Sequence, residues 1–240
     1  RADTAAKARD VIIDLLEKHG QGGNCGYRHE LYYGNGFLIA DPREAFVLET
    51  MGKMWVWRRV EGVWTISNVP SITNDYEDIS PDLIPTAIEE GWCKNKEDFN
   101  FRECCSKKII TWGAAGKPRQ KSTRQQLKEL LGNLTMQDFM RILRSHKYPD
   151  EEGWRIDKGI KGTVCKHAGN SITRPDSTTS SMIAKLAESP KERIFLVSGS
   201  SNPCLSPYFP VFSTMASLPS DYIKGGENYE PHSYWWKAEY

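Results

Sequence analysis

The first twenty residues place apolar side chains at intervals of three and four positions, with polar residues between them. The apolar members of this pattern are Ala8, Val11, Ile12, Leu15 and Leu16. Such spacing puts them on one face of a helix. Thr4 can cap the start of that helix, and Gly20 follows two basic residues at its end. The pattern predicts an amphipathic helix over residues 4–20 that packs against the rest of the fold.

After a glycine-rich bend at residues 20–26, the apolar pattern changes to that of strands. Segments rich in aromatic and β-branched residues follow at 32–40, 45–50, 54–59 and 63–67. Turn-forming residues separate them at Asp41-Pro42-Arg43, Gly52-Lys53 and Glu61-Gly62. Because turns of this kind join neighbouring strands, the pattern predicts short antiparallel strands connected by hairpins.

The second half of the chain returns to helical and then to strand-like patterns. A short helix is expected near 86–90, and the polar stretch 117–124 is expected to be exposed. Helices are predicted over 123–131 and after Thr135, and strands at 162–166, 178–186 and 194–198. The order of helix, strands, helices and strands predicts an α+β domain with a layered sheet core.

Composition narrows the function classes. The chain has 240 residues, 39% of them apolar, which is the size of one large domain with a substantial core. A formal net charge of +1 lacks the basic excess that nucleic-acid binding requires. The longest apolar runs, at 37–40 and 194–197, are far shorter than the roughly 20 residues that cross a bilayer. We therefore expect neither nucleic-acid binding nor membrane insertion.

The six cysteines lack the density and spacing of a disulfide-stapled secreted module, which favours a reducing, cytoplasmic location. Cys165 and His167 could form half of a metal site, but the spacing shows no second pair that completes four ligands. A buried thiol on a strand is therefore the favoured interpretation of Cys165, and no metal or cofactor is expected.

Asn68 is the main candidate for catalysis. It ends the predicted strand 63–67, after two strands that surround an Asp-Pro turn. A side-chain amide at a strand end can point its NH2 group at the oxyanion that develops in acyl transfer. From spacing alone, a turn-forming asparagine remains the favoured interpretation.

Several segments, in the same order along nearly the whole chain, resemble the secernin and dipeptidase A family of N-terminal-nucleophile hydrolases. They are the opening helix, His19-Gly20-Gln21-Gly22-Gly23-Asn24, Leu48-Glu49-Thr50-Met51-Gly52, Ser67-Asn68, Val164-Cys165-Lys166-His167, Ser177-Thr178-Thr179-Ser180-Ser181-Met182, residues 199–210 and Tyr234-Trp235-Trp236. Residues 37–70 are also similar to the related penicillin V and bile-salt acylases.

This resemblance implies a four-layer αββα fold and hydrolysis of amide bonds in small peptides, of the dipeptidase type. In such peptidases an N-terminal Cys attacks the carbonyl while its own α-amino group, with an ordinary pKa of about 8, serves as base. Carried over, Asn68 matches the oxyanion-hole asparagine. Arg174 is a weaker candidate for binding the substrate carboxylate through its forked donors, and a solvated loop arginine is the alternative.

The chain departs from the family at its start, since Arg1 has neither thiol nor hydroxyl. The resemblance implies that residues 1–240 are one partial domain, without the opening strands and without the end of the family's chain. An upstream segment or a second chain would then supply the nucleophile, and this chain alone would be inactive. A catalytically silent scaffold or interaction subunit, within a homo-oligomer or a larger assembly, is the alternative.

A rival nucleophile is Cys25, which with His167 and Asn170 superficially resembles a papain-like protease. In that class the Cys opens a long helix, whereas strand-like residues 31–40 follow Cys25. The papain-like interpretation is therefore disfavoured.

Overall fold

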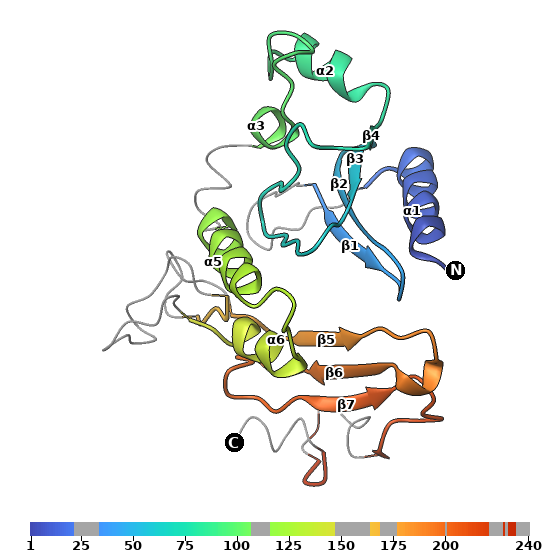
Figure 1. The fold of residues 1–240 in the computed structure, drawn as a ribbon, viewed down its shortest axis with the longest axis vertical. Coiled ribbons are helices and arrows are strands. Elements are labelled where there is room, and N and C mark those ends of the chain that lie inside the picture. The colour runs from blue at the N-terminus through green and yellow to red at the C-terminus, as the bar shows by residue number, and fades with distance from the viewer. Residues whose placement is uncertain are drawn as a thin grey trace. The chain divides into compact units, whose positions relative to one another are not determined.

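A computed structural model describes residues 1–21, 34–106, 116–146, 164–168, 177–199, 201–220, 228 and 230–233. The chain divides into two compact units, Arg1–Leu131 and Gly132–Tyr240. Each unit has its own antiparallel sheet and at least one helix (Figure 1). The mixture of helices and antiparallel sheets confirms the α+β class. Among the described residues, no helix is long and apolar enough to span a lipid bilayer.

The opening helix is present as predicted. Helix α1 spans Ala5–His19, and the hydroxyl of Thr4 accepts a hydrogen bond from the backbone of Lys7. Gly20 ends the helix with a φ of 72° and donates its N–H to the carbonyl of Leu16. This left-handed conformation suits glycine, which has no Cβ to clash. Local capping therefore fixes both ends of α1.

The first sheet contains strands β1 (Gly36–Ala40), β2 (Ala45–Met51), β3 (Met54–Arg59) and β4 (Asp78–Ile79), in that order and all antiparallel. Strands β1 to β3 confirm three of the predicted strands, and β4 was not predicted. The register places Leu48 of β2 between Phe37 and Trp57. Strand β2 is thus the centre of the hairpin pair.

The predicted strand at 63–67 is wrong, because the segment has only an isolated bridge between Ser67 and Val69. Its backbone bonds to a side chain instead of to a neighbouring strand. The carbonyl of Thr65 accepts a hydrogen bond of 3.0 Å from the side chain of Gln120. The aromatic and β-branched composition of this segment reflects burial against the sheet, since Trp64 and Ile66 pack on the core.

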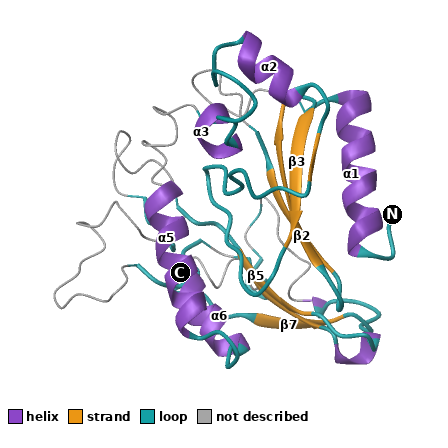
Figure 2. Cartoon of the chain, turned by 45° about the horizontal axis from the view of Figure 1, so that its top comes forward, coloured by secondary structure: helices purple, strands orange, loops and turns teal. Residues whose placement is uncertain are grey.

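Helix α1 covers one face of the first sheet (Figure 2). Ile13 and Leu16 of the helix form a buried cluster with Leu48 and Trp55 of the sheet. The guanidinium of Arg9 lies over the ring of Trp57, 3.9 Å from its centroid. Apolar burial and this cation–π contact together hold the helix on the strands.

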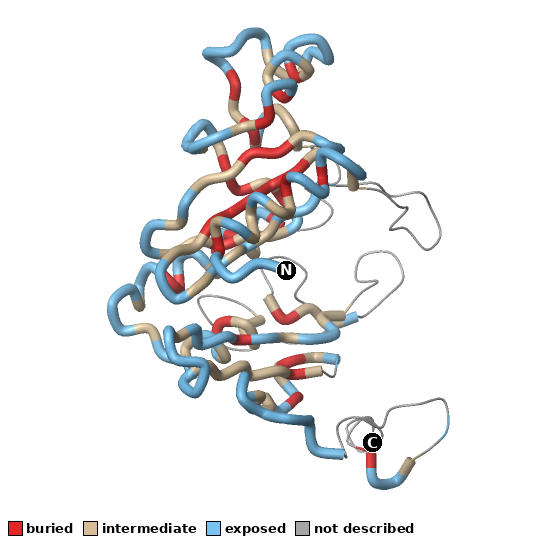
Figure 3. Tube along the Cα trace, turned by 90° about the vertical axis from the view of Figure 1, so that its right-hand side faces the viewer, coloured by how far each residue is buried: buried red, intermediate tan, exposed pale blue. Residues whose placement is uncertain are grey.

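Helices α2 (Leu83–Glu89) and α3 (Phe101–Cys105) pack over the opposite face. The buried residues of this second cluster are Val47, Val56, Ile72, Leu83, Ala87, Phe99 and Phe101. Residues 46–50 of β2 are buried on both faces of the sheet as a result (Figure 3). The short helix predicted at 86–90 corresponds to α2, which begins three residues earlier and ends at Glu89, and α3 was not predicted.

Helix α5 (Gly116–Glu129) begins earlier than the predicted residue 123. Residues 117–124 were expected to be exposed, and that expectation is wrong in part because Gln120 and Ser122 are buried. The amide of Gln120 is satisfied by the carbonyl of Thr65, so a polar residue can occupy this interior position. The polar composition of residues 117–124 predicted an exposed segment because it could not show this hydrogen bond.

The second unit combines helix α6 (Met136–Leu143) with a sheet of β5 (Ser181–Lys185), β6 (Ile194–Ser198) and β7 (Phe209–Phe212). A short 3-10 turn, η1 (Pro190–Glu192), joins β5 to β6. Thr135 and Asp138 form a reciprocal capping box at the start of α6, and α6 contacts β5. Strand β6 confirms its prediction, β5 is shorter than predicted, and β7 was missed. Residues 164–166 of the predicted strand 162–166 are irregular, and 162–163 lie outside the described residues.

Glu49 is a buried carboxylate on the α2 and α3 side of the first sheet, with 4% of its surface exposed. It accepts hydrogen bonds from the backbone N–H of Ser71 (2.7 Å), the hydroxyl of Ser71 (2.6 Å) and the backbone N–H of Ile72 (2.9 Å). Burial raises the pKa of Glu49, and the hydrogen bonds from Ser71 and Ile72 oppose that rise. The carboxylate therefore anchors residues 71–72 to the centre of β2.

We predict that Glu49→Gln destabilises the protein at neutral pH by about 1–3 kcal/mol. The amide NH2 would face backbone N–H donors and leave one of them without an acceptor. Urea unfolding followed by tryptophan fluorescence measures the effect. Glu61→Gln, an isosteric change at an exposed turn residue, is the matched control. Equal stability of the two variants would contradict the role of Glu49.

Candidate functional site

Asn68 lies on the irregular segment that crosses the first sheet, and its side chain is exposed. Its Oδ1 atom accepts a hydrogen bond from Nη2 of Arg119 on α5. Since arginine only donates, the contact identifies the oxygen of the amide, and the NH2 group of Asn68 is the donor end. Arg119 thus binds the oxygen of this amide and leaves its NH2 group as the donor end.

Two further contacts hold the backbone around Asn68. The neighbouring residue Val69 is buried, and the carboxylate of Glu49 accepts hydrogen bonds from the backbone N–H groups of residues 71–72. Gly116, at the start of α5, lies so close that a Cβ there would sit 2.9 Å from Cγ1 of Val69 and 3.1 Å from the carbonyl carbon of Asn68. A glycine at this position therefore lets α5 approach the Asn68 backbone.

Of the other residues predicted for a hydrolase site, only His167 of the papain-like interpretation lies in the described part of the chain. Arg174, Cys25 and Asn170 lie outside the described residues.

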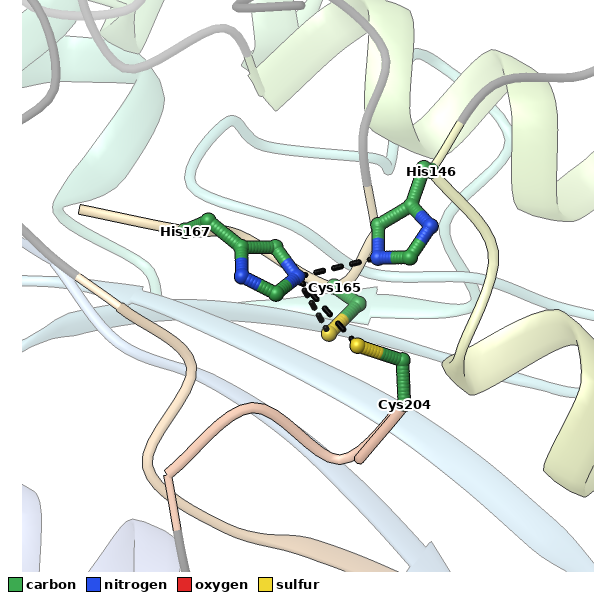
Figure 4. A group of neighbouring side chains, drawn as sticks. All are labelled: His146, Cys165, His167 and Cys204. Atoms are coloured by element: carbon green, nitrogen blue, oxygen red, sulfur yellow. Dashed lines mark hydrogen bonds between the residues drawn. The ribbon is translucent and has the colours of Figure 1, made fainter. Parts of the chain in front are cut away.

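A second group of reactive side chains gathers in the unit Gly132–Tyr240, where His146, Cys165, His167 and Cys204 face one another (Figure 4). Their potential ligand atoms all lie within 4.8 Å of one another. Nε2 of His167 is 2.9 Å from Nε2 of His146, 3.7 Å from Sγ of Cys165 and 3.3 Å from Sγ of Cys204. The two thiols and two imidazoles thus converge on one small volume.

Backbone hydrogen bonds bring the first two segments of this cluster together. The carbonyl of Ser145, just after α6, accepts the N–H groups of Val164 and Cys165 at 3.1 and 3.0 Å. Lys166 in turn pairs with Thr178, whose N–H donates to its carbonyl at 3.0 Å. The positions of His146, Cys165 and His167 therefore follow from the end of α6 and the approach to β5.

The turn that carries Cys204 is attached to the same two elements. The N–H of Asn202 donates to the carbonyl of Thr178 at 2.8 Å. Arg144, which ends α6, donates to the carbonyls of Pro203 at 2.9 Å and Ser206 at 2.6 Å. Asn202 takes a left-handed φ of 61°, which asparagine tolerates better than most residues. Cys204 is thus held between α6 and the start of β5.

Burial shifts the pKa values of two of these four side chains, Cys165 and His167. Cys165 is buried, while the other three side chains are half-buried. Burial raises the pKa of the Cys165 thiol to about 12, and it lowers the pKa of His167. The lowered pKa of His167 favours its neutral imidazole, which has one ring nitrogen able to accept a hydrogen bond or bind a metal.

Sequence spacing gave Cys165 and His167 as a pair but found no partners for them. The structure brings in His146 and Cys204, which are 21 and 37 residues from His167. Neither distance belongs to a common ligand motif, so only the fold could identify these two residues.

No model of a known protein family matches the chain. The site must therefore be interpreted from its own geometry.

We predict that Gly116→Ala destabilises the protein by about 1–3 kcal/mol, because the new methyl group would overlap Val69 and the Asn68 backbone. Chemical denaturation measures the change. Combining it with Val69→Ala, which removes the nearest obstructing atom, should make the effect of Gly116→Ala smaller than in the wild-type background. An equal or smaller cost in the wild-type background would contradict the close approach of α5.

Proposed function

We propose that this chain contributes the oxyanion side of a cysteine amide hydrolase of the dipeptidase type. The proposal follows the resemblance to the secernin and dipeptidase A family. The observation that supports it best is the contact between Arg119 and the amide oxygen of Asn68, because it makes the NH2 group of Asn68 an oriented donor. An oriented donor stabilises a tetrahedral oxyanion without reorganisation during the reaction.

In this proposal, the nucleophile is an N-terminal Cys from an upstream segment or a second chain. Its thiol attacks the amide carbonyl of a small peptide, and its α-amino group takes the thiol proton. The negative charge on the carbonyl oxygen is stabilised by the NH2 group of Asn68, and Arg174 binds the peptide carboxylate. The protonated α-amino group then gives its proton to the leaving nitrogen as the C–N bond breaks, and water hydrolyses the resulting thioester, which releases the acid and restores the thiol.

The four-layer αββα sandwich is part of the same proposal. The chain has two antiparallel sheets: α1 packs on one face of the first sheet, α2 and α3 pack over its opposite face, and α6 contacts the second sheet. Among the described residues, β1 pairs on one side only, with β2. An unpaired strand edge can accept a further strand through backbone hydrogen bonds, which gives a place for the strand of the nucleophile.

The test uses the complete native protein, with any upstream segment or companion chain, and a panel of dipeptides. We expect hydrolysis, and Asn68→Ala should lower kcat by about 10²- to 10³-fold, since that is the usual cost of one oxyanion donor. Arg119→Met should cause a smaller loss of kcat, because the donor remains but is no longer oriented.

Asn74→Ala is the matched control, since Asn74 is an exposed asparagine a few residues along the same segment. It should leave kcat unchanged, and circular dichroism should show that all variants fold. Absence of amide hydrolysis by the complete protein, or full activity of Asn68→Ala, would contradict the proposal. Either result would favour the catalytically silent scaffold or interaction subunit.

A further inference from the structure

We propose that His146, Cys165, His167 and Cys204 bind one zinc ion as a structural centre of the unit Gly132–Tyr240. The inference is independent of the proposed amide hydrolysis, which depends on residues of the unit Arg1–Leu131. It follows from the ligand set, the distances and the way in which the three segments are joined.

The three distances from Nε2 of His167 are close to those around a tetrahedral ion. With Zn–N bonds of about 2.05 Å and Zn–S bonds of about 2.3 Å, tetrahedral angles place two nitrogens about 3.3 Å apart and a nitrogen and a sulfur about 3.6 Å apart. The corresponding separations are 2.9 Å between the histidine nitrogens, and 3.3 and 3.7 Å between His167 and the sulfurs. Shifts of less than about 0.5 Å would bring these contacts to tetrahedral values.

The ligand types also select the ion. Two thiolates and two imidazoles form the S2N2 set that tetrahedral zinc prefers over magnesium or calcium, which bind oxygen. Binding exchanges two thiol protons for the metal: Zn²⁺, two Cys–SH and two neutral His give a neutral complex and release two H⁺.

Four protein ligands leave no coordination position for water or substrate, which is the arrangement of structural sites. The described part of this unit buries few apolar side chains. They are Ile142, Cys165, Ile183 and Pro203, whereas Met182 and Leu205 are 63% and 75% exposed. A small core of this kind needs a staple, and the ion would cross-link the end of α6, residues 164–168 and the Cys204 turn.

Two other arrangements use fewer of the residues. A disulfide between Cys165 and Cys204 would use the two thiols alone and leave His146 and His167 as a hydrogen-bonded pair, with 2.9 Å between their Nε2 atoms. A thiol–imidazole pair for nucleophilic catalysis requires only one histidine. If His167 were that histidine, its Nε2 atom would already be hydrogen-bonded to His146. Only a shared metal ion gives all four side chains the same role.

The test begins with the metal content of the full protein, purified without chelators and under reducing conditions. We expect one zinc ion per chain, and replacement by Co²⁺ should give the visible absorption of tetrahedral cobalt bound to thiolates. Competition with a chromophoric chelator gives the affinity. Zinc should also protect Cys165 and Cys204 from a thiol reagent, as mapped by peptide mass spectrometry.

Cys204→Ser should weaken zinc affinity by more than about 100-fold, because loss of an outer-shell partner alone costs 10- to 100-fold. Cys204→His, which restores a fourth ligand, should recover binding even if Cys204→Ser folds poorly. Cys105→Ser, at a free cysteine of the other unit, is the matched control and should retain the ion. A wild-type protein that binds no zinc, a Cys165–Cys204 disulfide under reducing conditions, or zinc unaffected in Cys204→Ser would overturn the proposal.

Discussion

The hydrogen-bonded carboxylate of Glu49 is the interaction on which the first unit depends. It is the acidic side chain that the described part of the chain buries, at the centre of β2 between two apolar layers. An isolated buried carboxylate costs several kcal/mol, and the donors of Ser71 and Ile72 offset that cost only if their segment stays in place. The sheet and the segment that crosses it therefore stabilise each other.

That constraint extends to Asn68. Glu49 holds the segment at Ser71, three residues after Asn68. Helix α5 lies close to the backbone of Asn68 because residue 116 is glycine. Arg119 then sets the orientation of the side-chain amide. An exposed asparagine on an irregular segment would ordinarily sample several rotamers, and these contacts convert it into a positioned donor.

The sequence predicted the elements whose patterns are local. Helix α1, with its Thr4 cap and Gly20 stop, and the hairpin strands β1 to β3 follow from periodicity and turn residues. It failed where a side chain replaces a backbone partner, as Gln120 does for the 63–67 segment. It also failed for His146 and Cys204, because ligands far apart in sequence meet only through the packing of α6 and β5.

We propose that Asn68 serves a nucleophile from outside this chain, and the N-terminal sequence and mass of the mature native protein, with any companion chain, test that proposal. The account predicts a mature N-terminal Cys on a segment that precedes residue 1 or on the companion, modified by a thiol-directed inhibitor that abolishes dipeptide hydrolysis. A mature protein with no N-terminal Cys, Ser or Thr on any of its chains would contradict it.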